Sequence, residues 1–469
     1  MSSDPTPKGP TPVDLIVAGG TCLTLDTDRR ILTDSAIVVD AGRIVAIGSQ
    51  RGLERDYLPS ARVDATGCVV TPGYVDAHIH LSQHLGRSSI PDIWPEHREH
   101  DHWLPYWLTM TEEDSYLSAL LACMEMARNG TTTFCDMSGR FSAEIQAKAA
   151  DAVGLRGLVS EICWDVPPHP EVAIGDTDAC LERLERVVAA FPRTEESRVW
   201  AGVAMSGMGK ASDRLIVEGK RLAERHGIVL YMHQSFAESD TQAFLRRTNG
   251  RLAVHHLDDL GILGPDVHLV HMIHTDAAEI PVLAETHTNV VHCPGASVRW
   301  GLGVSRTGAV PEMLAAGVNV ALGSDSGNYA DAFDIGKQAY LAATIHREAR
   351  GGTPVISAEA ALEMATLNGA RAVGAEDRIG SLEPGKRADL VIHGADRPEW
   401  HPSLDPVTTL LYAAQSSGVR DVIVDGRVIL RDGRLTQIDE QDAYGQIDAA
   451  ARSLADRMGF VVPHRWPVH

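Results

Sequence analysis

Two histidines two positions apart, His78 and His80, close an apolar run that begins at Val69. Along a β-strand successive side chains alternate between the two faces, so residues i and i+2 point the same way. The pair can therefore aim two imidazole rings at one metal ion. With 21 histidines in the chain, about one His-x-His match is expected by chance, and His100 with His102 is a second one. The interpretation of His78 and His80 as metal ligands therefore rests on the strand-like context and on matching residues downstream.

Three further polar residues close apolar, strand-like segments downstream of this pair. One segment ends in His233, the next ends in His271, and a third runs from Val318 to Asp325. In (β/α)8 barrels the active site lies at the carboxyl ends of the strands. Four imidazoles and one carboxylate would then meet at one mouth, which is the ligand set of a single borderline metal such as zinc with a position left open for water.

The elements that must position these residues alternate in type between residues 71 and 378. Short apolar segments are followed by amphipathic ones, which predicts βα units and a parallel sheet. Eight strands within about 300 residues fit an α/β fold of the (β/α)8 TIM-barrel kind with insertions. The predicted strands are Val69–His80, Thr131–Cys135, Leu155–Glu161, Val199–Met205, Ile228–His233, Val267–His271, Thr288–Cys293 and Val318–Gly323.

One helix of this barrel shows the logic of the prediction. Thr111 followed by Asp114 resembles a capping box at a helix start. An apolar stripe at helical spacing runs from Leu117 to Met124, and Gly130 can end the helix. The β-branched residues that follow predict the next strand.

Segments rich in β-formers at both ends of the chain predict a second, smaller domain. We expect residues 13–70 and 379–437 to form one composite β-sandwich domain, with the catalytic barrel of residues 71–378 inserted between them. Residues 1–12 are predicted to be a flexible polar tail. Residues 438–469 are predicted to form a C-terminal helix and tail.

The composition excludes several classes of protein. The 469-residue chain has a formal net charge of −21, and since phosphate contacts need a basic surface, no nucleic-acid partner is expected. No apolar run approaches the length of a membrane span, and the polar start does not resemble a signal peptide. Seven scattered cysteines without a Cys-x-x-Cys motif fit reduced thiols, so a cytoplasmic location is expected.

Several motifs in sequence order resemble those of the amidohydrolase superfamily, in the subgroup that contains cyclic deaminases, S-adenosylhomocysteine deaminases and triazine hydrolases. The similarity covers nearly the whole chain. It rests on the strand-end histidines and on Thr71-Pro-Gly-Tyr-Val-Asp-Ala-His-Ile-His80, Asn129-Gly-Thr-Thr-Thr133, Val291-His-Cys-Pro294, the segment from Val310 to Asp325, and Ile379-Gly-Ser-Leu-Glu-Pro-Gly-Lys-Arg-Ala-Asp-Leu-Val391.

The resemblance implies one divalent metal ion, zinc first and iron, cobalt or manganese as alternatives. Its ligands would be His78, His80, His233 and Asp325. Two residues are predicted to be catalytic: Asp325 would move the proton of the attacking water, and His271 would stabilise the charge that develops on the substrate. The partners it implies are a small-molecule substrate and water, and a homo-oligomer is expected.

The part of the sequence that would contact the substrate departs from the deaminase pattern. In those enzymes the strand-5 motif reads His-x-x-Glu and the Glu protonates a ring nitrogen, whereas Phe236 stands at that position here. Glu238 is two residues further on, where a continuing strand would place it on the same face as Phe236. The His-x-Pro element of strand 4 is also absent from Val203–Gly209. Other candidates for substrate contact are His84, Trp103, Trp300 and Asn328.

These departures leave the expected reaction, hydrolysis, unchanged and favour substrates that need no protonation of a ring nitrogen. The favoured function is metal-dependent hydrolysis of a non-peptide C–N bond, or a related C–S or C–Cl bond, in a urea, carbamate, thiocarbamate or amide. The alternative is a deaminase or hydrolase of an N-heterocycle such as a purine, pyrimidine or triazine. A remote alternative is a catalytically inactive barrel that serves as a scaffold.

Overall fold

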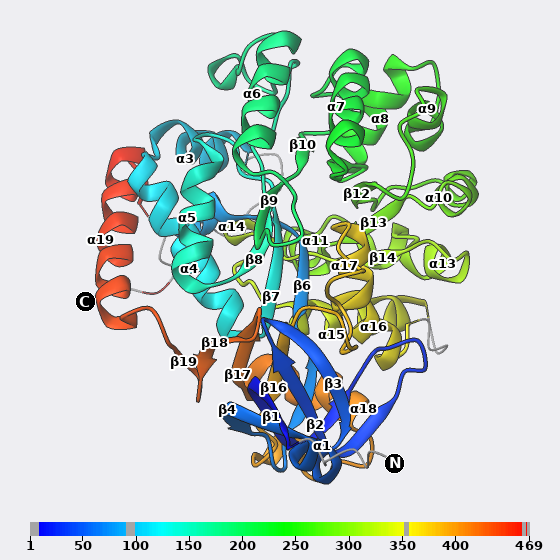
Figure 1. Ribbon diagram of the computed structural model, residues 1–469. Coiled ribbons are helices and arrows are strands. Elements are labelled where there is room, and N and C mark those ends of the chain that lie inside the picture. The colour runs from blue at the N-terminus through cyan, green and yellow to red at the C-terminus, as the bar shows by residue number, and fades with distance from the viewer. Residues whose placement is uncertain (1–8, 91–98, 351–355, 462–465, 467–469) are drawn as a thin grey trace, which may run out of the picture.

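The computed structural model describes residues 9–90, 99–350, 356–461 and 466, and it consists of a barrel and a smaller sheet domain (Figure 1). The barrel forms the larger, upper part of the view, and the strands from both chain ends gather below it. The α/β barrel fold and the composite second domain that the sequence predicted are both present.

Two five-stranded parallel sheets form the barrel, in the orders β15-β6-β7-β8-β9 and β10-β11-β12-β13-β14. Only Gly202 separates β9 from β10, and only Gly323 and Ser324 separate β14 from β15, so the two sheets are halves of one ring of eight strand positions. The strands are β6 (Tyr74–His80), β7 (Thr131–Asp136), β8 (Arg156–Val159), β9 (Val199–Ala201), β10 (Val203–Met205), β11 (Leu230–Gln234), β12 (Val267–His271), β13 (Asn289–His292), β14 (Val320–Leu322) and β15 (Asp325–Ser326).

Each of the eight predicted strand segments overlaps an observed strand, and the first and the fourth are each divided into two strands. The structure divides the first segment into β5 (Val69–Pro72), which joins the small domain, and β6, which opens the barrel. Gly73 lies at the division, where a Cβ atom would come within 2.0 Å of the Thr132 hydroxyl oxygen. A residue without a side chain therefore lets the chain pass from one domain to the other.

Helices cover the outside of the barrel, and the predicted capping box is present at one of them. The Thr111 side chain accepts from the Asp114 N–H, and the Asp114 carboxylate accepts from the Thr111 N–H. The main helices are α3 (Leu104–Thr109), α4 (Glu112–Arg128), α5 (Ala143–Val153), α6 (Thr177–Ala190), α7 (Asp213–His226), α8 (Glu238–Arg247), α9 (Ala253–Asp259), α10 (Ile280–Glu285), α11 (Pro294–Trp300), α12 (Val304–Thr307), α13 (Val310–Ala315), α14 (Gly327–Ala330), α15 (Ile335–Arg350), α16 (Ala358–Ala365) and α17 (Leu367–Ala372).

The small domain is one nine-stranded mixed sheet from both chain ends, in the order β19-β18-β17-β16-β5-β1-β2-β3, with β4 also paired to β1. The sheet curls, because the start of β3 exchanges backbone hydrogen bonds with residues 385–386, and it encloses its own apolar core. One curled sheet thus replaces the two separate sheets of a strict β-sandwich. Its elements are β1 (Thr11–Leu23), β2 (Ile31–Asp40), β3 (Arg43–Ser49), α1 (Gln50–Asp56), β4 (Tyr57–Asp64), β5, β16 (Leu390–His393), β17 (Val419–Val424), β18 (Arg427–Arg431) and β19 (Arg434–Leu435).

The chain ends differ partly from the prediction. Residues 1–8 of the predicted tail lie outside the described residues, but Thr11 and Pro12 already belong to β1, because they pair with Tyr57 and Leu58 of β4. At the other end the predicted helix is α19 (Glu440–Met458), which packs against α3 and α4 on the side of the barrel (Figure 1). No helix among the described residues is both long enough and apolar enough to span a bilayer.

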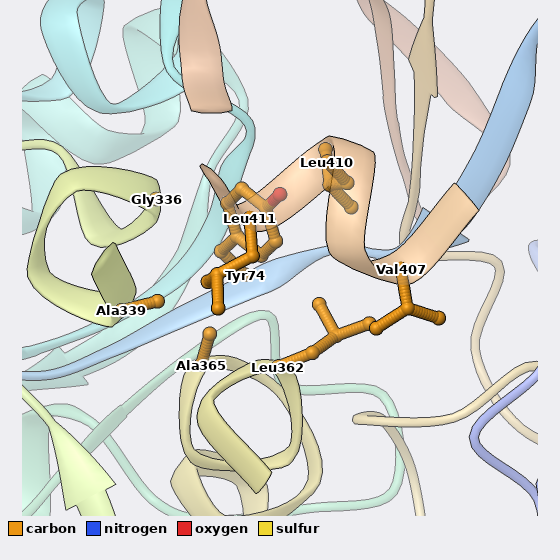
Figure 2. Close-up of a pocket in the computed structure, with 8 residues that line it drawn as sticks. All are labelled: Tyr74, Gly336, Ala339, Leu362, Ala365, Val407, Leu410 and Leu411. Atoms are coloured by element: carbon orange, nitrogen blue, oxygen red, sulfur yellow. The ribbon is translucent and has the colours of Figure 1, made fainter. Parts of the chain in front are cut away.

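A small cavity lies between the barrel and the segment that carries α18 (Pro406–Thr409). Its volume of about 10 Å³ is at the lower limit for one water molecule, and apolar cavities of this kind stay dry. We interpret it as a packing void. Figure 2 shows its lining residues, which are Tyr74, Gly336, Ala339, Leu362, Ala365, Val407, Leu410 and Leu411.

A buried ion pair joins the amino-terminal ends of the barrel strands to the small domain. Arg156, the first residue of β8, donates from Nε to Asp389 Oδ2 at 2.7 Å and from Nη2 to Asp389 Oδ1 at 3.1 Å, and it also contacts Asp425. The Arg156 side chain is 1% exposed. The small domain therefore closes the barrel end opposite the carboxyl ends of the strands and leaves those ends open for chemistry.

We predict that Arg156→Met destabilises the protein by about 3–5 kcal/mol, because it leaves the Asp389 carboxylate buried without its partner. The matched control is Arg214→Met, which breaks an exposed pair with Asp178 and is expected to change stability by less than about 1 kcal/mol. Urea unfolding followed by tryptophan fluorescence measures both. Equal unfolding midpoints for the two variants would contradict the prediction.

Candidate metal centre and active-site cavity

Strand β6 places His78 and His80 side by side at its carboxyl end. Every residue of β6 is buried, and the two imidazole rings lie 4.9 Å apart at an angle of 87°. His80 Nδ1–H donates to the Met137 carbonyl at 2.8 Å, which fixes the tautomer and leaves the Nε2 lone pair exposed toward the barrel axis. Both ring nitrogens of His78 are buried without a hydrogen-bond partner among the described residues.

His233 at the end of β11 completes a pair of facing lone pairs with His80. Its Nδ1–H donates to the Ser206 carbonyl at 3.2 Å, so its Nε2 also carries a lone pair, and this atom lies 3.3 Å from His80 Nε2. Two metal–nitrogen bonds of about 2.0–2.1 Å at a tetrahedral angle place two nitrogens about 3.3–3.4 Å apart. The observed separation therefore fits two ligands of one metal ion.

Asp325 brings a carboxylate to the same point from the eighth strand position. Its Oδ1 lies 3.8 Å from His78 Nε2 and 3.7 Å from His80 Nε2. The residue adopts a positive φ of 68°, which is strained for a residue with a side chain. The backbone N–H of Ser324 donates to Asp76 Oδ1 at 3.0 Å, and this contact ties the Asp325 segment to β6.

His271 at the end of β12 joins the same cluster. One ligand atom from each of His78, His233 and His271 lies within 4.8 Å of the others, and the same is true of His78, His80 and Asp325. His271 also has a positive φ, 79°. The structure thus brings together all five residues that the strand ends predicted, with His78 common to both groups.

Burial keeps these histidines neutral, which is the form that binds a metal. It lowers the pKa of His80 to about 4, and burial together with the nearby His80 lowers the pKa of His271 to about 3. Burial also raises the pKa of Asp325 to about 7, although the Ser326 N–H acts in the opposite direction and Asp76 adds to the rise. A divalent cation among these groups would hold the Asp325 carboxylate in its charged form.

The second His-x-His pair does not join a metal-binding group among the described residues. His100 and His102 lie on η2 (Glu99–Trp103), and the His102 ring packs edge-on against Phe460 at 5.2 Å. This pair is therefore part of the segment beside the barrel mouth. Much of that segment, residues 91–98, lies outside the described residues.

A cavity of about 670 Å³ opens above the cluster and reaches His80, His233, His271 and Asp325. This volume is in the range of small-molecule sites. Its walls are rich in aromatic side chains contributed by loops and helices around the mouth. They are Trp103, Trp107, Trp164, Phe236, Phe244, Trp300 and Tyr329.

Five of the aromatic residues form two groups with ring contacts inside each group. Trp164 follows β8, the third strand position, and stands 5.6 Å from Trp107, which in turn stacks on Trp103 at 5.3 Å. Trp300 follows β13, the seventh position, and stacks on Tyr329 at 3.8 Å. Trp107 follows β6, the first strand position, and Tyr329 follows β15, the eighth, so the aromatic side chains line the mouth from several sides.

The residues predicted to contact the substrate divide into two sets. Trp103, Phe236 and Trp300 line the cavity, and the Phe236 ring lies 4.5 Å from that of His271. His84 and Asn328 do not line it. The His84 ring stacks on Phe333 at 4.0 Å and contacts Glu125 at 2.5 Å, whereas the Asn328 side chain accepts from Ser326 Oγ at 2.9 Å.

Glu238 does not occupy the place of the missing strand-5 acid. Strand β11 ends at Gln234, Ser235 takes a positive φ of 51°, and α8 begins at Glu238, so the alternation of a strand does not reach that residue. Glu238 is exposed and does not line the cavity. Its carboxylate acts instead on His274, whose pKa it raises against the larger lowering by burial.

Sequence reasoning missed Trp164, Lys210 and Phe244 as lining residues. Trp164 and Lys210 each follow a barrel strand by a few positions, and this position relative to the strand end is a signal that could have found them. Phe244 lies in the middle of α8, and nothing in its immediate sequence distinguishes it from an ordinary packing residue.

A family model for the amidohydrolase family matches residues 69–429. The chain is 33% identical over 450 residues to a 5-methylthioadenosine/S-adenosylhomocysteine deaminase of Syntrophobacter fumaroxidans, which covers 95% of this chain and 99% of that one. It is also 33% identical over 445 residues to a 5'-deoxyadenosine deaminase of Methanosarcina mazei, with 95% and 99% covered. The chain belongs to the amidohydrolase family. It is a hydrolase that acts on carbon–nitrogen bonds other than peptide bonds.

Solved structures agree with this assignment. An adenosine deaminase from Xanthomonas campestris with bound zinc superposes with a TM-score of 0.89 at 27% identity, over 96% of this chain and 100% of that one. An atrazine chlorohydrolase from Arthrobacter aurescens complexed with zinc gives a TM-score of 0.84 at 22% identity, over 93% and 100%, and shows the common fold alone.

We predict that His78→Ala and His233→Ala each lose stoichiometric metal, because each removes one of the nitrogens that meet at the centre. The affinity loss should exceed the roughly 10–100-fold typical of removing a group that only hydrogen-bonds a ligand. His274→Ala is the matched control, since that neighbouring histidine belongs to neither metal-binding group. Elemental analysis of the purified, folded variants after dialysis measures the effect. Full metal content in His233→Ala, or its loss in His274→Ala, would contradict the ligand set.

Proposed function

We propose that the protein hydrolytically deaminates an aminated N-heterocycle at a single divalent ion, zinc first, held by His78, His80, His233 and Asp325. The observation that carries the proposal is the 3.3 Å separation of two imidazole lone pairs beneath a cavity with aromatic walls. A divalent cation bound by both nitrogens would stabilise this arrangement. The aromatic walls suit a flat ring above it.

The metal, when bound, supplies a Lewis acid that lowers the pKa of a water molecule toward neutrality. The chain's own residues do the rest. Asp325 takes a proton from the attacking water and returns it to the leaving amine, so that ammonia departs. His271 donates a hydrogen bond to the oxygen that adds to the substrate. The buried floor of the cavity excludes bulk water from the reacting atoms.

Two independent observations support a heterocycle as the substrate. Aromatic side chains line the cavity, and a planar ring can contact them through its faces or edges. The relatives with 33% identity are named as deaminases of adenosine-type compounds. We therefore place this class ahead of the ureas and carbamates that the sequence alone favoured.

Phe236 supports a second candidate, hydrolysis of a urea, carbamate or thiocarbamate. The carbonyl or thiocarbonyl carbon of such a substrate needs no protonation of a ring nitrogen, and Phe236 offers no proton where related deaminases have a Glu. The apolar ring also fits beside the N-alkyl or N-aryl group of these compounds. This candidate shares the metal centre and differs only in the substrate.

A panel of substrates distinguishes the two candidates. We expect zinc-loaded enzyme to release ammonia from aminopurines, aminopyrimidines or aminotriazines and to act more slowly on ureas and carbamates. Removing the metal with a chelator should abolish turnover, and adding zinc back should restore it. Faster release of amine from ureas or carbamates would favour the second candidate function over deamination. Activity that survives complete removal of the metal would contradict both.

We predict that Asp325→Asn lowers kcat by about 10²–10⁴, because the amide cannot carry the proton of the attacking water. Glu238→Gln is the control, since the structure places that carboxylate outside the cavity, and it should keep the activity of the parent protein. Steady-state kinetics with ammonia detection gives both values, and metal content is measured in parallel. A large loss in Glu238→Gln would show that this acid reaches the substrate after all.

A further inference from the structure

Lys210 and Arg247 are the cavity's basic side chains other than histidine among the described lining residues. Arg247 lies at the end of α8, where its guanidinium sits over the Phe244 ring at 5.3 Å, and the residue is exposed. Lys210 lies in the loop between β10 and α7 and is half-buried. Strand β10 pairs with β11, which carries His233, so Lys210 is the cation on the loop next to the metal centre.

The loop that carries Lys210 is pressed against a residue of the metal centre. The Ser206 carbonyl accepts the hydrogen bond from His233 Nδ1. Gly207 has a φ of 109°, and a Cβ atom there would come within 2.0 Å of the His233 carbonyl oxygen. Only glycine allows this approach, so the loop position is set by contact with β11.

The other end of the same loop is held as well. The Lys210 N–H donates to the Gly207 carbonyl at 3.1 Å, and the Val166 N–H donates to the Lys210 carbonyl at 3.0 Å. Both ends of the loop are therefore fixed, and Lys210 lines the cavity from the loop after β10, the strand next to the one that carries His233.

The chemistry of deamination requires a donor in this region. When water adds to the carbon of an aminated N-heterocycle, the electron pair of the C=N bond moves to the ring nitrogen, and a hydrogen-bond donor there stabilises the charge that develops. Phe236 cannot donate, and Glu238 lies outside the cavity. Asp240 lines the cavity from α8, but it is exposed to solvent.

We propose that Lys210 is a catalytic residue that donates a charge-assisted hydrogen bond to the ring nitrogen next to the carbon under attack. The inference rests on the proposed deamination and deepens it by naming the group that replaces the strand-5 acid. An ammonium group donates without first having to be protonated, whereas a carboxylic acid donates only in its neutral form. The substrate class is accordingly a heterocycle with an unsubstituted ring nitrogen beside the amine-bearing carbon.

The first test is Lys210→Met in the zinc-loaded, full-length protein, assayed on the best aminated heterocycle of the panel. We expect kcat to fall by about 10²–10³, as for removal of one donor to a developing charge, with a smaller change in KM. Lys210→Arg should keep part of the activity, because it retains a charged donor. Lys337→Met is the control for loss of a positive charge at an exposed position. Metal content must stay stoichiometric in all four proteins, since a loss through His233 would mimic the effect.

The second test is rescue from the neighbouring strand. Phe236→Glu places an acid where related deaminases have one, so the double variant Lys210→Met with Phe236→Glu should regain at least about tenfold over Lys210→Met alone. Its activity should also rise as the pH falls, because a carboxylic acid donates only when protonated. The activity of Lys210→Arg should not rise in this way as the pH falls, because its donor is already charged. A lysine with a purely structural role would not be replaced by an acid on the adjacent loop.

The outcomes separate this inference from the proposed function. If the parent protein releases ammonia from no aminated heterocycle, the proposed function fails and this inference fails with it. If the parent protein is active and Lys210→Met keeps its kcat, the deamination stands and the role of Lys210 is overturned. Loss of activity in Lys210→Met without rescue by Phe236→Glu, together with loss of metal, would also overturn it in favour of a structural role.

Discussion

The candidate metal centre depends on two imidazole lone pairs that face each other. The tautomers of His80 and His233 are fixed by the carbonyls of Met137 and Ser206, so their Nε2 atoms face each other at 3.3 Å with no proton between them. That arrangement is unfavourable unless a cation lies between the two nitrogens. The carbonyl contacts hold the site in the geometry of the bound state before any ion arrives, and little reorganisation is left for binding.

The rest of the barrel serves to keep these groups from moving apart. Asp325 and His271 both have positive φ angles, a strained conformation that persists only when the surrounding structure overdetermines it. Asp76 provides part of that constraint, since its carboxylate accepts from the Ser324 N–H where the ring passes from β14 to β15. At the opposite end, the Arg156 ion pair fixes the small domain against the strand starts, so the centre is built on a frame held at both ends.

The sequence predicted what depends on regular periodicity and failed where periodicity ends. His78 and His80 were predictable because the strand repeat of two is rigid, and His233, His271 and Asp325 because each closes an apolar strand. His84 was misplaced since the chain turns into η1 (Leu81–Gly86) immediately after His80, which directs the ring into the wall beside Glu125. Asn328 lies on α14, and Ser235 interrupts the strand before Glu238. Loop conformation, which a single sequence does not encode by spacing, decides these positions.

Phe236 and Lys210 have complementary electrostatic effects in the proposed mechanism. Phe236 packs on His271 at 4.5 Å and keeps that imidazole in apolar surroundings, which favours its neutral, donating form. In related deaminases the donor to the ring nitrogen is a Glu that follows the strand-5 histidine. Here the proposed donor, Lys210, lies on the adjacent loop instead. In the proposed mechanism, His271 acts on the attacking oxygen and Lys210 acts on the ring nitrogen.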